Sequence, residues 1–399
     1  MIFQEEMERK MGFWWSPDSK HLAFTEVDST EIPLYRIMHQ GKSYVGPDAE
    51  EDHAYPFAGA ANVKVRLGVV PSNGGEVTWM DLLCGDPHGP HSDEEYLARV
   101  NWMHNNAVAV QVLNRSHTKL KLLKFDINTG KRELLLEEQH DTWVTLHDCF
   151  TPLDKGANSK QPGGFIWASE KTGFRHLYVH DKNGVCLGPL TQGEWMVEQI
   201  AAVNESNGLI YFCGTLDGPL ETNLYQTNLF PDWSLPLQPP KRLTHGTGRH
   251  SVILDHQLLR FIDVYDSIKS PPVILLCSLL DGSVIMPLFE QPSTVPSLKK
   301  FQQLSPEIVE ITAKDGTTLY GTLYLPDERK YGPPPYKTLV SVYGGPGVQL
   351  VSDTWMSTVD MRAQYLRSKG ILVWKVNVLL LFLLEVERHF SLGGIMLLI

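Results

Sequence analysis

Residues 95–136 read EYLARVNWMHNNAVAVQVLNRSHTKLKLLKFDINTGKRELLL. Short apolar segments of strand length alternate here with turn residues such as Asn128-Thr129-Gly130. Similar units start near Trp143, Glu198 and His250, and an earlier one contains a Pro17-Asp18 turn between two strand-like segments. The starts lie about 50 residues apart, the spacing of four-stranded propeller blades. We therefore predict a mainly β fold with a partial β-propeller over residues 1–300. Two packed β-sandwiches are the alternative.

The composition changes near residue 305 and predicts a second domain over residues 305–375. A strand hairpin turns at Asp315-Gly316, and the run at 338–343 is apolar without interruption. Such a run is typical of a strand buried on both faces of an α/β sheet. The hairpin and this strand therefore predict the start of an α/β domain.

A helix and a further strand are expected after this run. Residues 354–369 have helical spacing, with Trp355, Val359, Tyr365 and Leu366 on one side, and Gly370 is expected to end the helix. Residues 371–374 predict another buried strand. Residues 376–399 follow as an aberrant apolar tail, for which intron read-through or a frameshift is our hypothesis. The tail is too short and too charged to predict a membrane span.

The charge and cysteine content exclude several classes of protein. The 399 residues carry a net charge of −11, which argues against a nucleic-acid-binding chain. The 5 cysteines are well separated and form no C-x-x-C pair, so neither a disulfide framework nor a structural zinc site is expected. The first ten residues contain no apolar leader segment. We expect a cytoplasmic protein with no metal and no cofactor.

The chemical motifs are few. A serine hydrolase of the α/β class needs a nucleophile on a G-x-S-x-G turn, and the sequence has none. Glu5 and Glu6 are adjacent on a short amphipathic segment predicted over residues 3–11. Such a pair is most often a solvated helix face, but two neighbouring carboxylates can also hold one ammonium group. His245, His250 and His256 are expected to be structural histidines.

Several ordered motifs resemble the dipeptidyl peptidase IV-type serine peptidases. The similarity extends over residues 1 to about 375 and is closest to the cytosolic dipeptidyl peptidase 8/9 branch, with a plant member as one interpretation. The segments that carry it are Gln4-Glu5-Glu6-Met7, Gly12-Phe13-Trp14-Trp15-Ser16-Pro17-Asp18, Thr25-Glu26-Val27-Asp28, Glu31-Ile32-Pro33, His53-Ala54-Tyr55-Pro56-Phe57, Trp167-Ala168-Ser169-Glu170, Gly173-Phe174-Arg175-His176-Leu177-Tyr178 and Val342-Tyr343-Gly344-Gly345-Pro346.

The resemblance implies a fold and a substrate class. The family has an eight-bladed propeller that covers an α/β-hydrolase domain, and it removes N-terminal dipeptides, preferably after proline. By resemblance, Glu5 and Glu6 would bind the free ammonium of a peptide N-terminus. Tyr343 would correspond to the tyrosine whose hydroxyl stabilises the tetrahedral oxyanion.

The departures from the family pattern limit the expected activity. The family's first blades precede the double glutamate, and its serine, aspartate and histidine follow the point where residues 376–399 depart. We therefore expect a chain truncated at both ends that is inactive alone. A non-catalytic propeller that serves as a binding scaffold is the alternative. Dimerisation is doubtful, because the family dimerises through hydrolase elements that are not among these residues.

Overall fold

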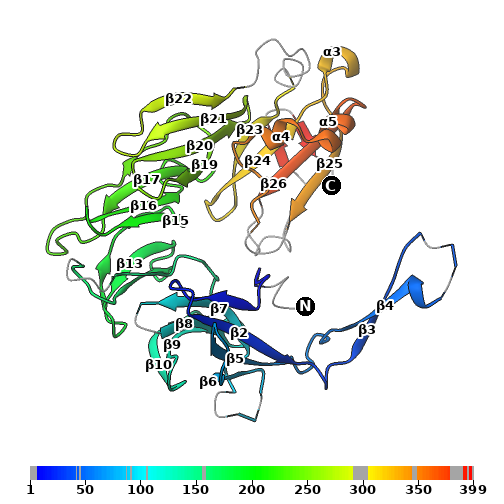
Figure 1. The fold of residues 1–399 in the computed structure, drawn as a ribbon. Coiled ribbons are helices and arrows are strands. Elements are labelled where there is room, and N and C mark those ends of the chain that lie inside the picture. The colour runs from blue at the N-terminus through cyan, green and yellow to red at the C-terminus, as the bar shows by residue number, and fades with distance from the viewer. Residues whose placement is uncertain are drawn as a thin grey trace. The chain divides into compact units, whose positions relative to one another are not determined.

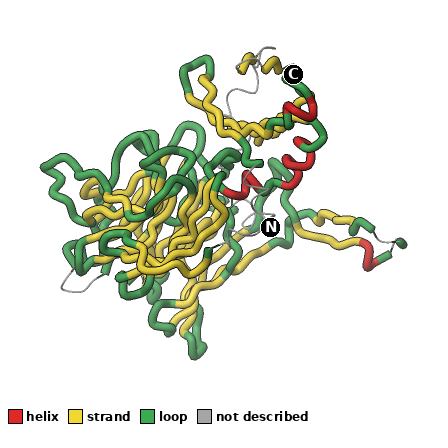
Figure 2. The backbone as a smooth tube through the Cα atoms, turned by 90° about the horizontal axis from the view of Figure 1, so that it is seen from above, coloured by secondary structure: helices red, strands yellow, loops and turns green. Residues whose placement is uncertain are grey.

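The computed structural model describes most of the chain in two compact units, one of residues 1–172 with 176–190 and one of 173–175 with 191–399 (Figure 1). The described residues are 7–41, 43–44, 46–86, 88–89, 92–104, 107–154, 159–290, 304–343, 348–377, 390–392 and 395–397. Strands dominate in both units, and helices are few and short (Figure 2).

The first unit contains three four-stranded antiparallel sheets. The first sheet has the order β1 (Phe13–Trp15), β2 (His21–Asp28), β5 (Lys64–Pro71) and β6 (Thr78–Cys84). The second has β7 (Tyr96–Met103), β8 (Ala107–Leu113), β9 (Lys119–Asp126) and β10 (Arg132–Gln139). The third has β11 (Thr151–Pro152), β12 (Phe165–Ser169), β13 (His176–His180) and β14 (Cys186–Pro189).

Burial explains why the central strands are apolar on both faces. All seven residues of β8 are buried, and so are all five residues of β12 and of β13. The outer strand β10 is instead largely exposed or half-buried. A continuous apolar run is therefore the signature of a strand in the middle of one of these sheets. The strands predicted within residues 95–136 are confirmed.

Glycines in two hairpin turns allow neighbouring sheets of the first unit to approach closely. Gly130, between β9 and β10, has φ 70°, and a Cβ added there would lie 2.1 Å from the Trp79 carbonyl oxygen on β6. Gly184, between β13 and β14, has φ 89°, and its Cβ would lie 1.8 Å from the Leu135 carbonyl oxygen on β10. Only glycine combines this backbone conformation with so close a contact.

A long hairpin is inserted between β2 and β5. It consists of β3 (Leu34–Met38), the single 3-10 turn η1 (Pro47–Ala49) and β4 (Glu50–Ala54), and it projects away from the sheets (Figure 1). Every residue of β3 is exposed. The two strands are joined by a bidentate pair in which Arg36 Nε and Nη2 each lie 2.8 Å from an Asp52 carboxylate oxygen.

The second unit contains two further four-stranded antiparallel sheets and one mixed sheet. The antiparallel sheets comprise β15 (Val197–Asn204), β16 (Leu209–Gly214), β17 (Asn223–Asn228) and β18 (Lys241–Arg242), then β19 (Arg249–Leu254), β20 (Arg260–Ser267), β21 (Ser270–Ser278) and β22 (Val284–Phe289). Their first strands start at the positions that the repeat predicted. The partial β-propeller of the prediction is therefore confirmed in its sheets.

The mixed sheet carries the start of the α/β domain. Its order is β23 (Glu307–Thr312), β24 (Thr318–Tyr324), β26 (Ile371–Asn377) and β25 (Lys337–Tyr343), with β25 and β26 parallel. Three short helices accompany it, α3 (Glu328–Tyr331), α4 (Trp355–Thr358) and α5 (Met361–Arg367). The hairpin predicted at Asp315-Gly316 is confirmed by the pairing of β23 with β24.

The end of β26 lies in the segment predicted as a tail. The strand continues through Val376 and Asn377. Beyond it the structure describes only a two-stranded antiparallel pair, β27 (Phe390–Leu392) with β28 (Ile395–Leu397).

One predicted helix is wrong. Residues 354–369 form two helices, α4 and α5, because Asp360 starts a new one: its side chain accepts a hydrogen bond from the Ala363 amide, 3.0 Å away. An aspartate that caps a helix N-terminus competes with continuation of the preceding helix. Tyr365, predicted on the packed side, is 62% exposed.

The prediction of a strand buried on both faces at 338–343 is also wrong. The strand β25 forms, but within the described residues it is the edge of the mixed sheet, paired only with β26. Leu339, Val340 and Val342 are consequently exposed.

The amphipathic helix predicted over residues 3–11 is not found in the part that is described. Residues 3–6 lie outside the described residues, and residues 7–11 are not helical. Among the helices of the described chain, none is both long and apolar enough to cross a membrane.

Two glycine substitutions test the close approach of the sheets. Gly184→Ala places a methyl group against the Leu135 carbonyl, so we expect it to lower the free energy of unfolding by more than about 3 kcal/mol. Gly59 has a similar φ of 81° but no atom within 4 Å of an added Cβ. Gly59→Ala should therefore cost only about 1 kcal/mol. Urea unfolding measures both, and equal losses would contradict the account.

Candidate functional site

The double glutamate leads directly into a firmly held segment of the first unit. Glu5 and Glu6 lie outside the described residues. The next residue, Met7, is 1% exposed and belongs to the hydrophobic core of this unit. Its carbonyl oxygen accepts a hydrogen bond from Arg99 Nη1 on β7, at 2.5 Å. The chain is thus fixed one residue after the glutamate pair.

The Arg99 guanidinium is itself aligned by a carboxylate. Its Nε donates to Asp148 Oδ1 at 2.5 Å, and its Nη1 also donates to the Ala98 carbonyl at 3.0 Å. The guanidinium of Arg9, two residues after Met7, lies close to that of Arg99. Burial is the main reason that the pKa of Arg9 falls to about 10, and the positive charge of Arg99 contributes to the fall. The two guanidinium groups therefore lie close to one another at this end of the unit.

Tyr343 occupies the place where α/β sheets carry functional groups. It is the last residue of β25 and lies opposite Asn377, the last residue of the parallel strand β26. The carboxyl ends of parallel strands meet at one edge, where ligands of such sheets bind. The Tyr343 side chain is 48% exposed. Tyr343 belongs to the second unit, whereas Met7 belongs to the first.

Asn377 fixes the backbone beside this tyrosine. Its Oδ1 accepts hydrogen bonds from the amides of Leu350 and Val351, at 2.8 and 3.0 Å. Leu350 and Val351 come a few residues after Tyr343 in the sequence. One side-chain oxygen at the end of β26 thus holds the segment that returns after β25.

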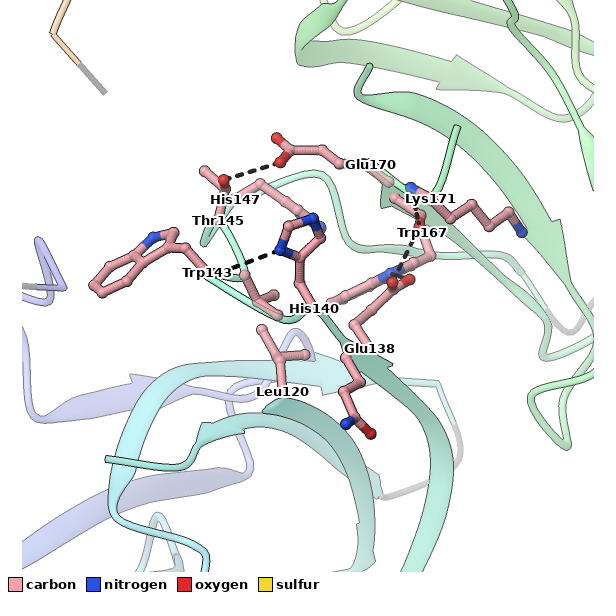
Figure 3. Close-up of a pocket in the computed structure, with 13 residues that line it drawn as sticks. Leu120, Glu138, His140, Trp143, Thr145, His147, Trp167, Glu170 and Lys171 are labelled. Atoms are coloured by element: carbon pink, nitrogen blue, oxygen red, sulfur yellow. Dashed lines mark hydrogen bonds between the residues drawn. The ribbon is translucent and has the colours of Figure 1, made fainter. Parts of the chain in front are cut away.

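A small cavity of about 70 Å³ lies between the second and third sheets of the first unit (Figure 3). Several of its polar side chains are hydrogen-bonded to one another. Glu138 accepts from Trp167 Nε1 and Ser169 Oγ, each at 3.1 Å, and Glu170 accepts from Thr145 Oγ1 at 2.9 Å. The Ser169 hydroxyl therefore donates its proton to the Glu138 carboxylate, which is not the arrangement of a serine activated by a histidine base.

A buried histidine–aspartate pair lies in the second unit. His250 Nδ1 is 2.8 Å from Asp263 Oδ2, and the imidazole stacks on Tyr265 with ring centroids 4.7 Å apart. Both partners are almost fully buried, on β19 and β20. The prediction that His250 is a structural histidine is confirmed by this pairing.

Arg99, Asp148 and Asn377 were not predicted from the sequence. Arg99 is 92 residues from the carbonyl that it holds, so no local spacing connects the two. The one signal was Arg99 itself, a charged residue within the largely apolar segment that starts the repeat unit at residue 95. Asn377 lay within the segment predicted as an aberrant tail, so no signal in the sequence pointed to it.

Comparison with known proteins identifies relatives of this chain. Residues 1–272 match the family model described as the dipeptidyl peptidase IV (DPP IV) N-terminal region. "Dipeptidyl peptidase 8" of Mus musculus is 28% identical over 93% of this chain and 48% of its own length. "Probable dipeptidyl peptidase 4" of Emericella nidulans is 24% identical over 89% of the chain and 46% of its own length.

A solved structure shows the same fold. The chain superposes on Porphyromonas gingivalis dipeptidyl peptidase 4 with a TM-score of 0.76 and 22% identity, over 94% of this chain and 50% of that one. The fold is therefore a partial β-propeller followed by the first elements of an α/β-hydrolase domain. The chain spans about half the length of the curated relatives it matches.

Substitution of Asn377 tests how the carboxyl edge beside Tyr343 is held. Asn377→Ala leaves two amides without their acceptor, so the Leu350 and Val351 amides should exchange with solvent at least about tenfold faster. Asn377→Asp keeps the acceptor oxygen and should preserve their protection. Hydrogen-exchange mass spectrometry measures both variants. Unchanged exchange in Asn377→Ala would show that other contacts hold this segment.

Proposed function

Because the chain belongs to the family of the dipeptidyl peptidase IV N-terminal region, we propose that it forms the substrate-binding part of a serine-type dipeptidyl peptidase. The substrate is a peptide with a free N-terminus, from which an X-Pro dipeptide is released. The observation that carries the proposal is the family match over residues 1–272, a span that includes Glu5 and Glu6.

The two glutamates recognise the substrate by its charge. Two adjacent carboxylates form charge-assisted hydrogen bonds to one ammonium group and discriminate against a blocked amine. Binding at this point sets the distance from the N-terminus to the bond that is cut, so dipeptides are released. The core position of Met7 and its bond to Arg99 support this role, since they fix the chain next to Glu6.

Tyr343 would act on the carbonyl of the scissile bond. Attack of a nucleophile on this carbonyl moves the π electrons onto oxygen, and the phenol O–H donates a hydrogen bond to the oxyanion that results. The nucleophilic serine and its histidine and aspartate partners are proposed to lie outside these 399 residues, since the sequence has no G-x-S-x-G turn.

A cytoplasmic location is part of the proposal. Cys84, Cys213 and Cys277 are buried thiols, and Cys186 is an exposed one. Reduced thiols in a protein of this size are typical of a reducing compartment.

Peptide binding tests the role of the glutamate pair. Isothermal titration with Ala-Pro-Ala should give a stable complex with the chain and none with the N-acetylated peptide. Glu5→Gln with Glu6→Gln should raise the Kd about 10- to 100-fold, because the ammonium loses charged acceptors. Glu8→Gln, which changes an exposed glutamate two residues away, serves as the control and should bind normally.

The pH dependence of the same titration has a defined sign. The peptide amine loses its proton as the pH rises through about 8. Binding should therefore weaken as the pH rises through this value, because the ammonium that the glutamates bind is lost. Equal affinity for the acetylated peptide would contradict the proposal and favour a propeller that binds other partners.

The activity of the chain alone is a separate prediction. The purified 399-residue chain should release no chromogenic group from an X-Pro substrate, because a tyrosine and two glutamates supply no nucleophile. Release above background that is lost on treatment with a serine-directed inhibitor would show that a nucleophile has been overlooked.

A further inference from the structure

The contact between Arg99 and Met7 joins two distant parts of the first unit at the residue next to the glutamate pair. Arg99 lies on β7, the outer strand of the second sheet, and Met7 precedes β1 of the first sheet. The bond joins the charged guanidinium of Arg99 to the backbone carbonyl of Met7, a residue that is 1% exposed. Charge-assisted bonds of this kind are shorter and stronger than neutral ones.

The guanidinium has little freedom to move. Nε is committed to Asp148, and Nη1 is shared between the carbonyls of Met7 and Ala98. The Arg99 side chain is only 16% exposed, whereas its partner Asp148 is 77% exposed. A planar fork held at both ends positions its target more rigidly than a lysine ammonium can.

A buried amide lies on the strand next to Arg99. Gln111 on β8 lies opposite Arg99 in the register, so both side chains project from the same face of the sheet. Gln111 is 1% exposed, and neither atom of its amide has a hydrogen-bond partner among the described residues. The polar face beneath Arg99 is thus enclosed by protein.

We propose that Arg99 is a positioning residue for recognition of the substrate's N-terminus: aligned by Asp148, it holds the Met7 carbonyl and thereby fixes the segment that carries Glu5 and Glu6. This inference rests on the proposed function. Arg99 acts through Met7 and does not itself contact the substrate.

Binding measurements with matched variants test this role. In Arg99→Gln, the Kd for Ala-Pro-Ala should rise about tenfold, the equivalent of one lost charge-assisted contact. The preference for the free amine over the acetylated peptide should fall with it. Arg99→Lys keeps the charge but loses the fork, so it should show an intermediate affinity.

A control separates positioning from stability. Arg132 lies in the same sheet, where its Nη2 is 2.6 Å from the Oε1 of the buried Glu94, and it does not contact Met7. Arg132→Gln should lower the melting temperature yet leave the Kd and the preference for the free amine unchanged.

Asp148→Asn changes a mostly exposed residue and keeps the fold, so it tests the alignment of Arg99 even if Arg99→Gln unfolds. It should raise the Kd about threefold, within the range of one weakened hydrogen bond.

The outcomes are distinguishable. If the unmodified chain binds the free-amine peptide but Arg99→Gln and Asp148→Asn bind it equally well, the inference is overturned and the proposed function stands. If Arg132→Gln loses affinity as Arg99→Gln does, the contact is only structural and the inference is overturned. If the unmodified chain binds neither peptide, the proposed function fails and the inference fails with it.

Discussion

Close backbone contact between neighbouring sheets is the constraint on which the rest of the structure depends. Gly130 and Gly184 each bring the last hairpin of one sheet against a carbonyl on the outer strand of the sheet before it. The same approach recurs in the second unit, where a Cβ at Gly282 would lie 2.1 Å from the Leu243 carbonyl oxygen. In the first unit, the central strands β8, β12 and β13 are buried along their whole length, and apolar residues dominate their sequences.

A firmly held side chain makes precise recognition possible. Arg99, on the outer strand β7, is held by Asp148 and in turn holds a carbonyl far away in the sequence. Recognition of a peptide N-terminus needs this precision, because the distance from ammonium to scissile bond decides the length of the product. The proposed function thus relies on a contact at the residue next to the glutamate pair.

The sequence predicts what is local and misses what depends on distant neighbours. Alternating strands and Gly turns located β7 to β10 and the Asp315-Gly316 hairpin, because hydrogen bonding and side-chain direction repeat over two to four residues. The run at 338–343 predicted a strand correctly, but its burial depends on which strands flank it. The helix over 354–369 failed at Asp360, whose capping role competes with helical periodicity. For the site, motif resemblance indicated Glu5, Glu6 and Tyr343, while Arg99 and Asp148 were missed because their contacts span tens of residues.

A crystal structure of the chain with Ala-Pro-Ala bound tests the central claim most directly. The account predicts that the peptide ammonium lies within about 3 Å of a carboxylate oxygen from both Glu5 and Glu6. It also predicts that Arg99 still donates to the Met7 carbonyl in that complex. A peptide bound elsewhere, or with its ammonium directed to other groups, would contradict the account.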